Sequence, residues 1–201
     1  MNTNNIFAVP AIFPNLEERI PTKNLTYTQQ SMLDAYLNIT YPSLKKYADF
    51  YEYKFKFIKE LYFQEANISL QKRVWCSKFY SLKNLLQEYD KVILSDFDII
   101  IKEFGDIQNE KKVGAIIKDN TTGKYKTQAE YVSDLTQKKV DKWYKASFLF
   151  IPEKYKPYFL EEMDKKFVEF VYDTTNITIN DEVFLNYVLY KHNIPVFPVN
   201  K

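Results

Sequence analysis

The chain has 201 residues, 46% of them hydrophobic, and its 28 Lys and Arg residues nearly balance its 26 Asp and Glu residues. This composition is typical of a globular protein and excludes a disordered chain, while the interspersed charges exclude a dedicated nucleic-acid binder with a basic stripe. The three glycines exclude a glycine-rich phosphate loop, and a single cysteine, Cys76, excludes an intrachain disulfide.

The sequence contains no run of 18 apolar residues and no N-terminal signal peptide. We therefore expect no transmembrane segment, and a protein that acts in the cytoplasm and is not secreted. We expect residues 1–201 to form a single domain, either a whole protein or the N-terminal part of a longer one.

Apolar periodicity and turn residues predict the elements in chain order. They begin with a strand at 5–9, a loop at 11–24, helical spacing at 27–47 with a break near Pro42, a strand at 53–58, a helix at 70–89 and a strand at 91–94. There follow a strand at 113–117, a turn at 118–125, a polar stretch at 128–142, a strand at 147–151, helices at 157–171 and 180–190, and an extended run at 194–199. Strands that alternate with helices predict an α/β fold, a single α/β/α sandwich with a mostly parallel, Rossmann-like central sheet.

Two aspartates, Asp96 and Asp98, lie between the apolar runs 92–94 and 99–101. Alternation along an extended backbone predicts that both carboxylates point to the same side. A buried carboxylate needs a partner, and Mn²⁺ or Mg²⁺ binds such oxygens while leaving positions open for phosphate. The segment predicts a strand that ends in a metal and phosphate site. The alternative is a strand end with two solvated aspartates, because so short a motif also arises by chance.

Three segments resemble those of nucleotide-sugar-dependent glycosyltransferases of the GT-A fold, which include small viral and bacterial enzymes. A helix with Trp75 and Lys78 leads to the apolar strand and the Asp-Phe-Asp motif at 96–98. The segment WYKASFLFI at 143–151 is similar to the strand after the acceptor loop, and NDEVFLN at 180–186 looks like the start of a late acidic helix. Together these segments span most of the chain.

Two features depart from the family pattern. The sequence Lys145-Ala146-Ser147 stands where relatives often carry Asn-x-Gly. Many relatives also place a histidine metal ligand after the last strand, whereas the only histidine here, His192, precedes the last predicted strand. Either His192 serves as the third ligand, or that ligand lies beyond this chain, or waters and phosphates complete the shell.

The resemblance implies a metal-dependent glycosyltransferase that moves a sugar from a nucleoside diphosphate sugar of UDP or GDP type to a glycan or other hydroxyl acceptor. For a viral enzyme, the compartment would be the host cytoplasm. The metal, Mn²⁺ or Mg²⁺, is expected on Asp98, with Asp96 binding it through water or holding the ribose, and His192 is the candidate third ligand. The candidate donor-binding residues are Ala8, Val9 and Pro10 at the end of the first strand, Arg73 and Lys78 on the helix at 70–89, and Asp96 and Phe97.

The candidate general base is Asp181 or Glu182, at the start of the late helix, and we favour Asp181. Each candidate has a structural alternative. Asp181 and Glu182 also fit an ordinary acidic first turn capped by Asn180. Arg73 and Lys78 also fit a solvated helix face, and His192 also fits a surface or capping residue. Trp143 and Tyr144 fit either stacking on an acceptor sugar or packing in the core.

Two other functions compete with sugar transfer. A haloacid-dehalogenase-type phosphatase also uses Asp-x-Asp after an apolar strand, with Asp96 as nucleophile. That family usually places its motif near the N-terminus and has Thr or Val where this chain has Ile100. The second alternative is a non-catalytic carbohydrate-binding protein that keeps the fold. Metal-dependent hydrolysis of a nucleotide sugar separates an enzyme from a binder.

Overall fold

The fold is described from a computed structural model, which covers residues 4–10, 34–58, 60–62, 68–102, 105, 107, 109–118, 123–172 and 181–199. The loop expected at 11–24, the first part of the helix expected at 27–47, and Asn180 lie outside these residues. None of the helices within these ranges is both long and apolar enough to cross a membrane.

The described elements alternate between strands and helices. The strands are β1 (Asn5–Pro10), β2 (Lys54–Ile58), β3 (Lys91–Ser95), β4 (Val113–Lys118), β5 (Trp143–Ile151) and β6 (Val196–Pro198). The helices are α2 (Tyr41–Phe50), preceded by the π-helical turn η1 (Tyr36–Thr40), α3 (Leu70–Glu88), α4 (Gly123–Thr136), the 3₁₀ turn η2 (Glu153–Tyr155), α5 (Lys156–Lys165), α6 (Phe167–Tyr172) and α7 (Asp181–Lys191).

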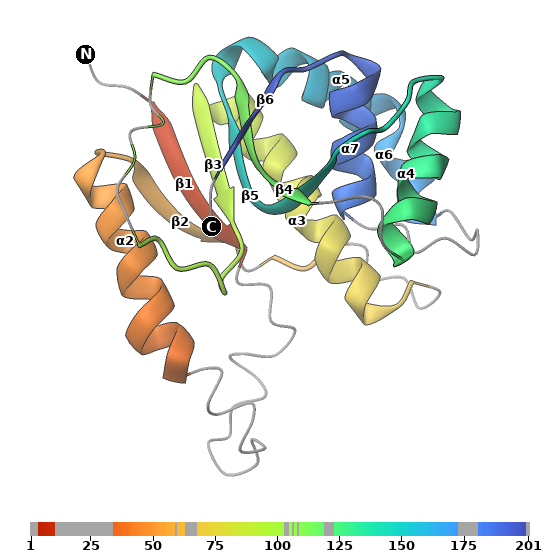
Figure 1. The fold of residues 1–201 in the computed structure, drawn as a ribbon. Coiled ribbons are helices and arrows are strands. Elements are labelled where there is room, and N and C mark those ends of the chain that lie inside the picture. Colours follow the sequence, from red (N-terminus) through yellow and green to blue (C-terminus); the bar gives the residue numbers. More distant parts are fainter. Residues whose placement is uncertain are drawn as a thin grey trace.

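The six strands form one sheet in the order β2-β1-β3-β5-β4-β6. All neighbours are parallel except at β5, which runs antiparallel to both β3 and β4. The prediction of an α/β fold with a mostly parallel sheet is therefore confirmed. The strand that precedes Asp96, β3, lies in the interior of the sheet between β1 and β5 (Figure 1).

Helices cover both faces of this sheet (Figure 1). Helix α2 packs on one face, and α3 to α7 pack on the other. Along β1, Ile6 and Ala8 join the core under the five helices, while Phe7 and Val9 join the core under α2. Burial on both faces in this way explains the continuous hydrophobic sequence of β1 from Ile6 to Pro10.

The structure corrects three local predictions. The polar stretch expected at 128–142 begins within α4, whose short apolar face of Ala129 and Val132 is buried. The strand expected at 147–151 starts earlier, at Trp143, because Trp143 and Ala146 are also buried in the core. The single helix expected at 157–171 is divided at Lys166 into α5 and α6.

Candidate functional site

The candidate site lies where β3 ends. The last strand residue, Ser95, is fully buried, and the backbone N–H of Asp96 donates to the carbonyl of Ser147 on β5 at 2.8 Å. The chain then turns, and the N–H of Ile99 donates to the carbonyl of Asp96 at 3.3 Å. The alternation predicted that the two aspartates share one face of an extended strand. That prediction is wrong, because the strand ends before them. Asp96 is partly buried, whereas Asp98 is exposed on the turn.

A buried lysine on α3 holds the site together. Helix α3 begins at the N-cap residue Ser69, and Lys78 lies on its buried face, only 4% exposed. The Nζ atom of Lys78 donates to Asp96 Oδ1 at 2.6 Å, to Asp181 Oδ2 at 3.1 Å and to the carbonyl of Ala146 at 2.6 Å. An ammonium has three protons, so each one has an acceptor. A buried charge needs such partners, and α3, β3, β5 and α7 meet at this one atom.

Strand β5 contributes through an irregularity in its pairing. Ala115 of β4 pairs with Leu149, but the next residue, Ile116, pairs with Lys145, so residues 146–148 bulge out of this ladder. A bulge redirects backbone groups and is common beside active sites. Here the carbonyl of Ala146 meets Lys78, and the next carbonyl meets the N–H of Asp96. The segment Lys145-Ala146-Ser147, singled out as a departure from the family pattern, is thus part of the site.

Opposing charges determine the protonation of this cluster. Burial by itself lowers the pKa of Lys78, but the neighbouring Asp96 and Asp181 outweigh this effect and raise it, so the ammonium stays charged. Burial raises the pKa of Asp181 above its usual value, and Lys78 offsets only part of that increase. Two carboxylates around one ammonium leave an excess negative charge, which favours a cation or the polar hydroxyls of a ligand.

Helix α7 is attached to the start of β5. The buried side chain of Asn186 accepts from the N–H of Tyr144 at 3.0 Å and donates to the carbonyl of Tyr144 at 2.8 Å. The indole Nε1 of Trp143 donates to Glu182 Oε2 at 3.1 Å. Burial raises the pKa of Glu182, while the hydrogen bond from Trp143 opposes this increase. These contacts place both acidic residues, Asp181 and Glu182, at the end of α7 that faces β3 and β5.

The other predicted donor-binding residues lie around this edge in different environments. Ala8 and Val9 are fully buried in β1, which is parallel to β3 and ends at the same edge of the sheet. Pro10 is also buried, so these three residues can offer a ligand little more than backbone. Arg73 is partly buried on α3, and its Nε has no hydrogen-bond partner among the described residues. Phe97 packs edge-on against Tyr36, with ring centroids 5.8 Å apart.

Two predicted residues lie away from any ligand at this edge. Trp143 is fully buried, which favours core packing over stacking on an acceptor sugar. His192 follows the far end of α7, about 16 Å from Asp181 along the helix axis. There its Nε2 lies 2.8 Å from Glu162 Oε1. The structure therefore does not bring His192 to Asp96 and Asp98.

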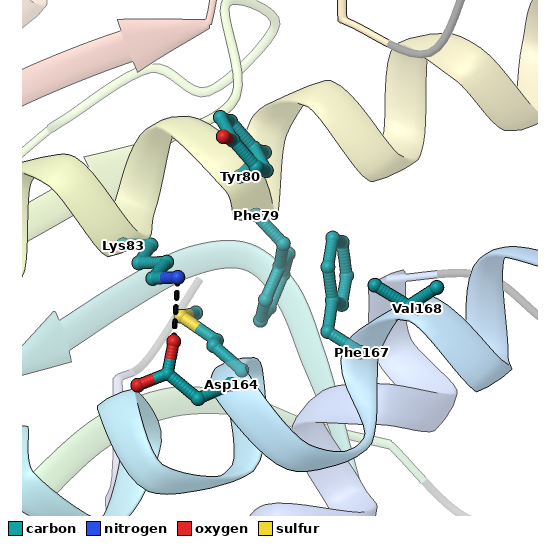
Figure 2. A pocket seen from close by; sticks show the side chains of 7 residues that line it. Phe79, Tyr80, Lys83, Asp164, Phe167 and Val168 are labelled. Carbon is teal, nitrogen blue, oxygen red and sulfur yellow. Dashed lines mark ion pairs between the residues drawn. The ribbon is translucent and has the colours of Figure 1, made fainter.

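A hollow elsewhere on the molecule does not belong to this site. It lies between α3 and the α5–α6 segment, and Phe79, Met163 and Phe167 form much of its lining (Figure 2). Lys83 and Asp164 form an ion pair across it at 2.6 Å. The hydrogen-bonded group of Lys78, Asp96, Ala146 and Asp181 is called the Lys78 cluster below, and none of its residues lines this hollow.

Neither a family model nor a curated protein sequence matches this chain. Among solved structures, it is similar to a glycosyltransferase involved in the glycosylation of the major capsid of PBCV-1, with 11% identity and a TM-score of 0.52 over 96% of this chain and 81% of that chain. The chain therefore shares its overall α/β architecture with that structure. A second similarity is to the galactosyltransferase LgtC, with 16% identity and a TM-score of 0.42 over 86% of this chain and 59% of that chain. Only the first similarity is strong enough to establish a shared architecture, and it extends over nearly all of the described sheet and helices.

Asp96 and Asp98 offer carboxylate oxygens at the end of β3. Asp98 and the second oxygen of Asp96 accept no hydrogen bond from the described residues. Carboxylate oxygens are the ligands that Mg²⁺ and Mn²⁺ prefer, and such ions commonly keep water or substrate phosphate in their other positions. These oxygens are of the type that such an ion binds, and His192 lies elsewhere, beside Glu162.

Proposed function

We propose that this protein transfers a sugar from a nucleoside diphosphate sugar to a hydroxyl group of a glycan or similar acceptor. The observation that carries the proposal is the contact of Lys78 with both Asp96 and Asp181 at the carboxyl edge of β3. In open α/β sheets, ligands bind outside this edge. The architecture that the chain shares with a solved glycosyltransferase supports the same assignment.

The donor diphosphate binds beside Asp96 and Asp98. We assign to these residues a divalent ion, Mn²⁺ or Mg²⁺, which supplies neutralisation of the phosphate charge when bound. Asp98 offers a whole carboxylate to this ion, whereas Asp96 offers one oxygen while Lys78 holds the other. Arg73, with an unpaired buried Nε among the described residues, supplies a second cationic group on the same helix as Lys78.

The two acidic residues of α7 have different roles in this proposal. Both oxygens of Asp181 accept hydrogen bonds, one from Lys78 and one from the N–H of Glu182. Glu182 accepts from Trp143 with one oxygen, while its other oxygen has no donor among the described residues. We therefore assign Asp181 to positioning and sugar binding, and Glu182 to accepting the proton of the acceptor hydroxyl. The raised pKa of Glu182 makes its ionised form a stronger base.

Thermal unfolding with UDP-, GDP- and dTDP-sugars, each with and without Mn²⁺, tests the proposal. We expect one nucleotide class to raise the melting temperature only when the metal is present, and to release its sugar in a metal-dependent hydrolysis assay. Asp98→Asn removes both effects. The matched control, Asp90→Asn, changes an exposed aspartate at the opposite end of β3 and retains them.

Stabilisation without hydrolysis or transfer would assign the site to a carbohydrate-binding protein. Release of phosphate from phosphomonoesters without sugar transfer would assign it to a phosphatase. Either result would overturn the proposed reaction.

A further inference from the structure

A second group of metal-ligating side chains lies at the far end of α7. His192 Nε2 is 2.8 Å from Glu162 Oε1, and the neighbouring residue on α5, Glu161, adds a second carboxylate. One ligand atom from each of the three side chains lies within 4.8 Å of the other two. This group is separate from the Lys78 cluster, because α7 lies between them.

Two of the three ligand groups are held in fixed positions by the fold. The side chain of Glu162 is fully buried, and its Oε2 accepts a hydrogen bond from Tyr187 at 3.0 Å. The ring of His192 lies against Tyr158, with centroids 5.0 Å apart. A preorganised imidazole and carboxylate bind an ion with little loss of side-chain entropy. Glu161 is exposed, so the group is open to solvent on one side.

The charges around this group also favour a cation. The negative end of the α7 dipole points toward it, since α7 ends at Lys191. Lys165 pairs with Glu161 at 2.6 Å, but both side chains are exposed, so the ammonium can be displaced by an ion. Lys191 reaches both oxygens of Glu162 and keeps one third of its side chain exposed, so it can remain on Oε2 while Oε1 is used elsewhere.

We propose that Glu161, Glu162 and His192 bind a zinc ion that joins α5 to the end of α7. An imidazole with two carboxylates is a donor set that Zn²⁺ accepts, whereas Mg²⁺ disfavours the nitrogen ligand. Ligand bonds of about 2.0–2.2 Å in a tetrahedral shell separate neighbouring ligand atoms by about 3.3 Å. The present 2.8 Å contact between His192 and Glu162 therefore opens by about 0.5 Å. Glu161 gives up its ion pair with Lys165 to bind the zinc ion, and a water molecule completes the coordination shell.

The test uses the fact that His192 is the only histidine in the chain. The full chain, without a histidine tag and stripped of metal with a chelator, is titrated with Zn²⁺ while the imidazole resonances are followed by NMR. We expect Zn²⁺ to shift these resonances with saturation at one equivalent and to raise the melting temperature. Mg²⁺ should leave the imidazole resonances unshifted. Co²⁺ should give the visible absorption of a tetrahedral site.

The variants His192→Gln and Glu161→Gln should each weaken Zn²⁺ binding about 100-fold. The matched control is Glu169→Gln, which alters an exposed glutamate paired with Lys166 on α6 and should leave binding unchanged. Asp98→Asn should also retain it, which separates this site from the proposed donor site. Unshifted imidazole resonances at saturating Zn²⁺, or equal affinity in the His192→Gln variant, would overturn the proposal.

Discussion

The variant Lys78→Met tests the buried cluster most directly, because methionine keeps an unbranched side chain of similar length and removes the charge. Besides the charge, the substitution removes the hydrogen-bond donor that Asp96, Asp181 and the carbonyl of Ala146 share. Breaking a buried ion pair by removing one partner costs about 3–5 kcal/mol. The side chain of Asp96 is 32% exposed and regains water, so we expect the lower end, about 3 kcal/mol.

The loss should depend on pH in a defined direction. Burial already raises the pKa of Asp181 above its unfolded value, and removal of the ammonium raises it further. A carboxyl group with a raised folded pKa binds its proton more tightly in the folded state, so its protonation favours folding at low pH. Stability is then lost as pH rises through that folded pKa. The deficit of Lys78→Met should therefore be largest near about pH 8 and shrink toward about pH 5.

Urea unfolding followed by tryptophan fluorescence measures this deficit at both pH values. Lys83→Met is the matched control, because it removes a lysine of the same helix from a pair whose partner, Asp164, is 61% exposed. That variant should lose no more than about 1 kcal/mol. Equal losses in the two variants, or a deficit in Lys78→Met that does not change with pH, would refute the role assigned to Lys78.

Three further predictions concern the proposed reaction and the attachment of α7. Asp98→Asn should abolish Mn²⁺-dependent binding of a nucleoside diphosphate in calorimetry. It should leave the free energy of unfolding in urea unchanged, since Asp98 is exposed. Metal-dependent binding at wild-type affinity in the variant would contradict the role of Asp98. Glu182→Gln should lower kcat by about 10²-fold or more, with donor affinity retained. The wild-type rate should also fall as pH drops through the raised pKa of Glu182. A wild-type kcat in the variant would place the base elsewhere. Asn186→Leu should destabilise the fold by about 1–2 kcal/mol in urea unfolding, because it leaves the partly buried N–H and C=O of Tyr144 without the amide. A loss below about 0.5 kcal/mol would show that water replaces the amide.

Local sequence patterns predicted most of the fold. The apolar run before Asp96 predicted the buried strand β3, and the helical spacing from Trp75 to Leu86 predicted α3 to within one residue at its end. These patterns are reliable because hydrophobic burial acts on every turn or every second residue of an element. The helix α4 was missed because its fully buried apolar side chains are only Ala129 and Val132, with Tyr125 and Tyr131 partly buried among polar residues.

The sequence also contained signals at the site whose meaning was open. Lys78 falls at the spacing of the buried face of α3, between Trp75 and Leu82, which indicates a lysine that needs a partner. Glu162 likewise falls between Phe159 and Met163 on the buried face of α5. Periodicity shows that such a charge is buried, but not which distant residue neutralises it.

Only the tertiary structure decided those partners. The antiparallel course of β5 and its bulge at 146–148 place a carbonyl over Lys78, and α7 brings Asp181 to the same atom from 103 residues away. The same helix carries His192 in the opposite direction, to Glu162. Which residues lie beside each buried charge, Lys78 and Glu162, follows from strand order and helix direction. The high energy of an unpaired buried charge then makes those pairings obligatory, and no local pattern in the sequence specifies them.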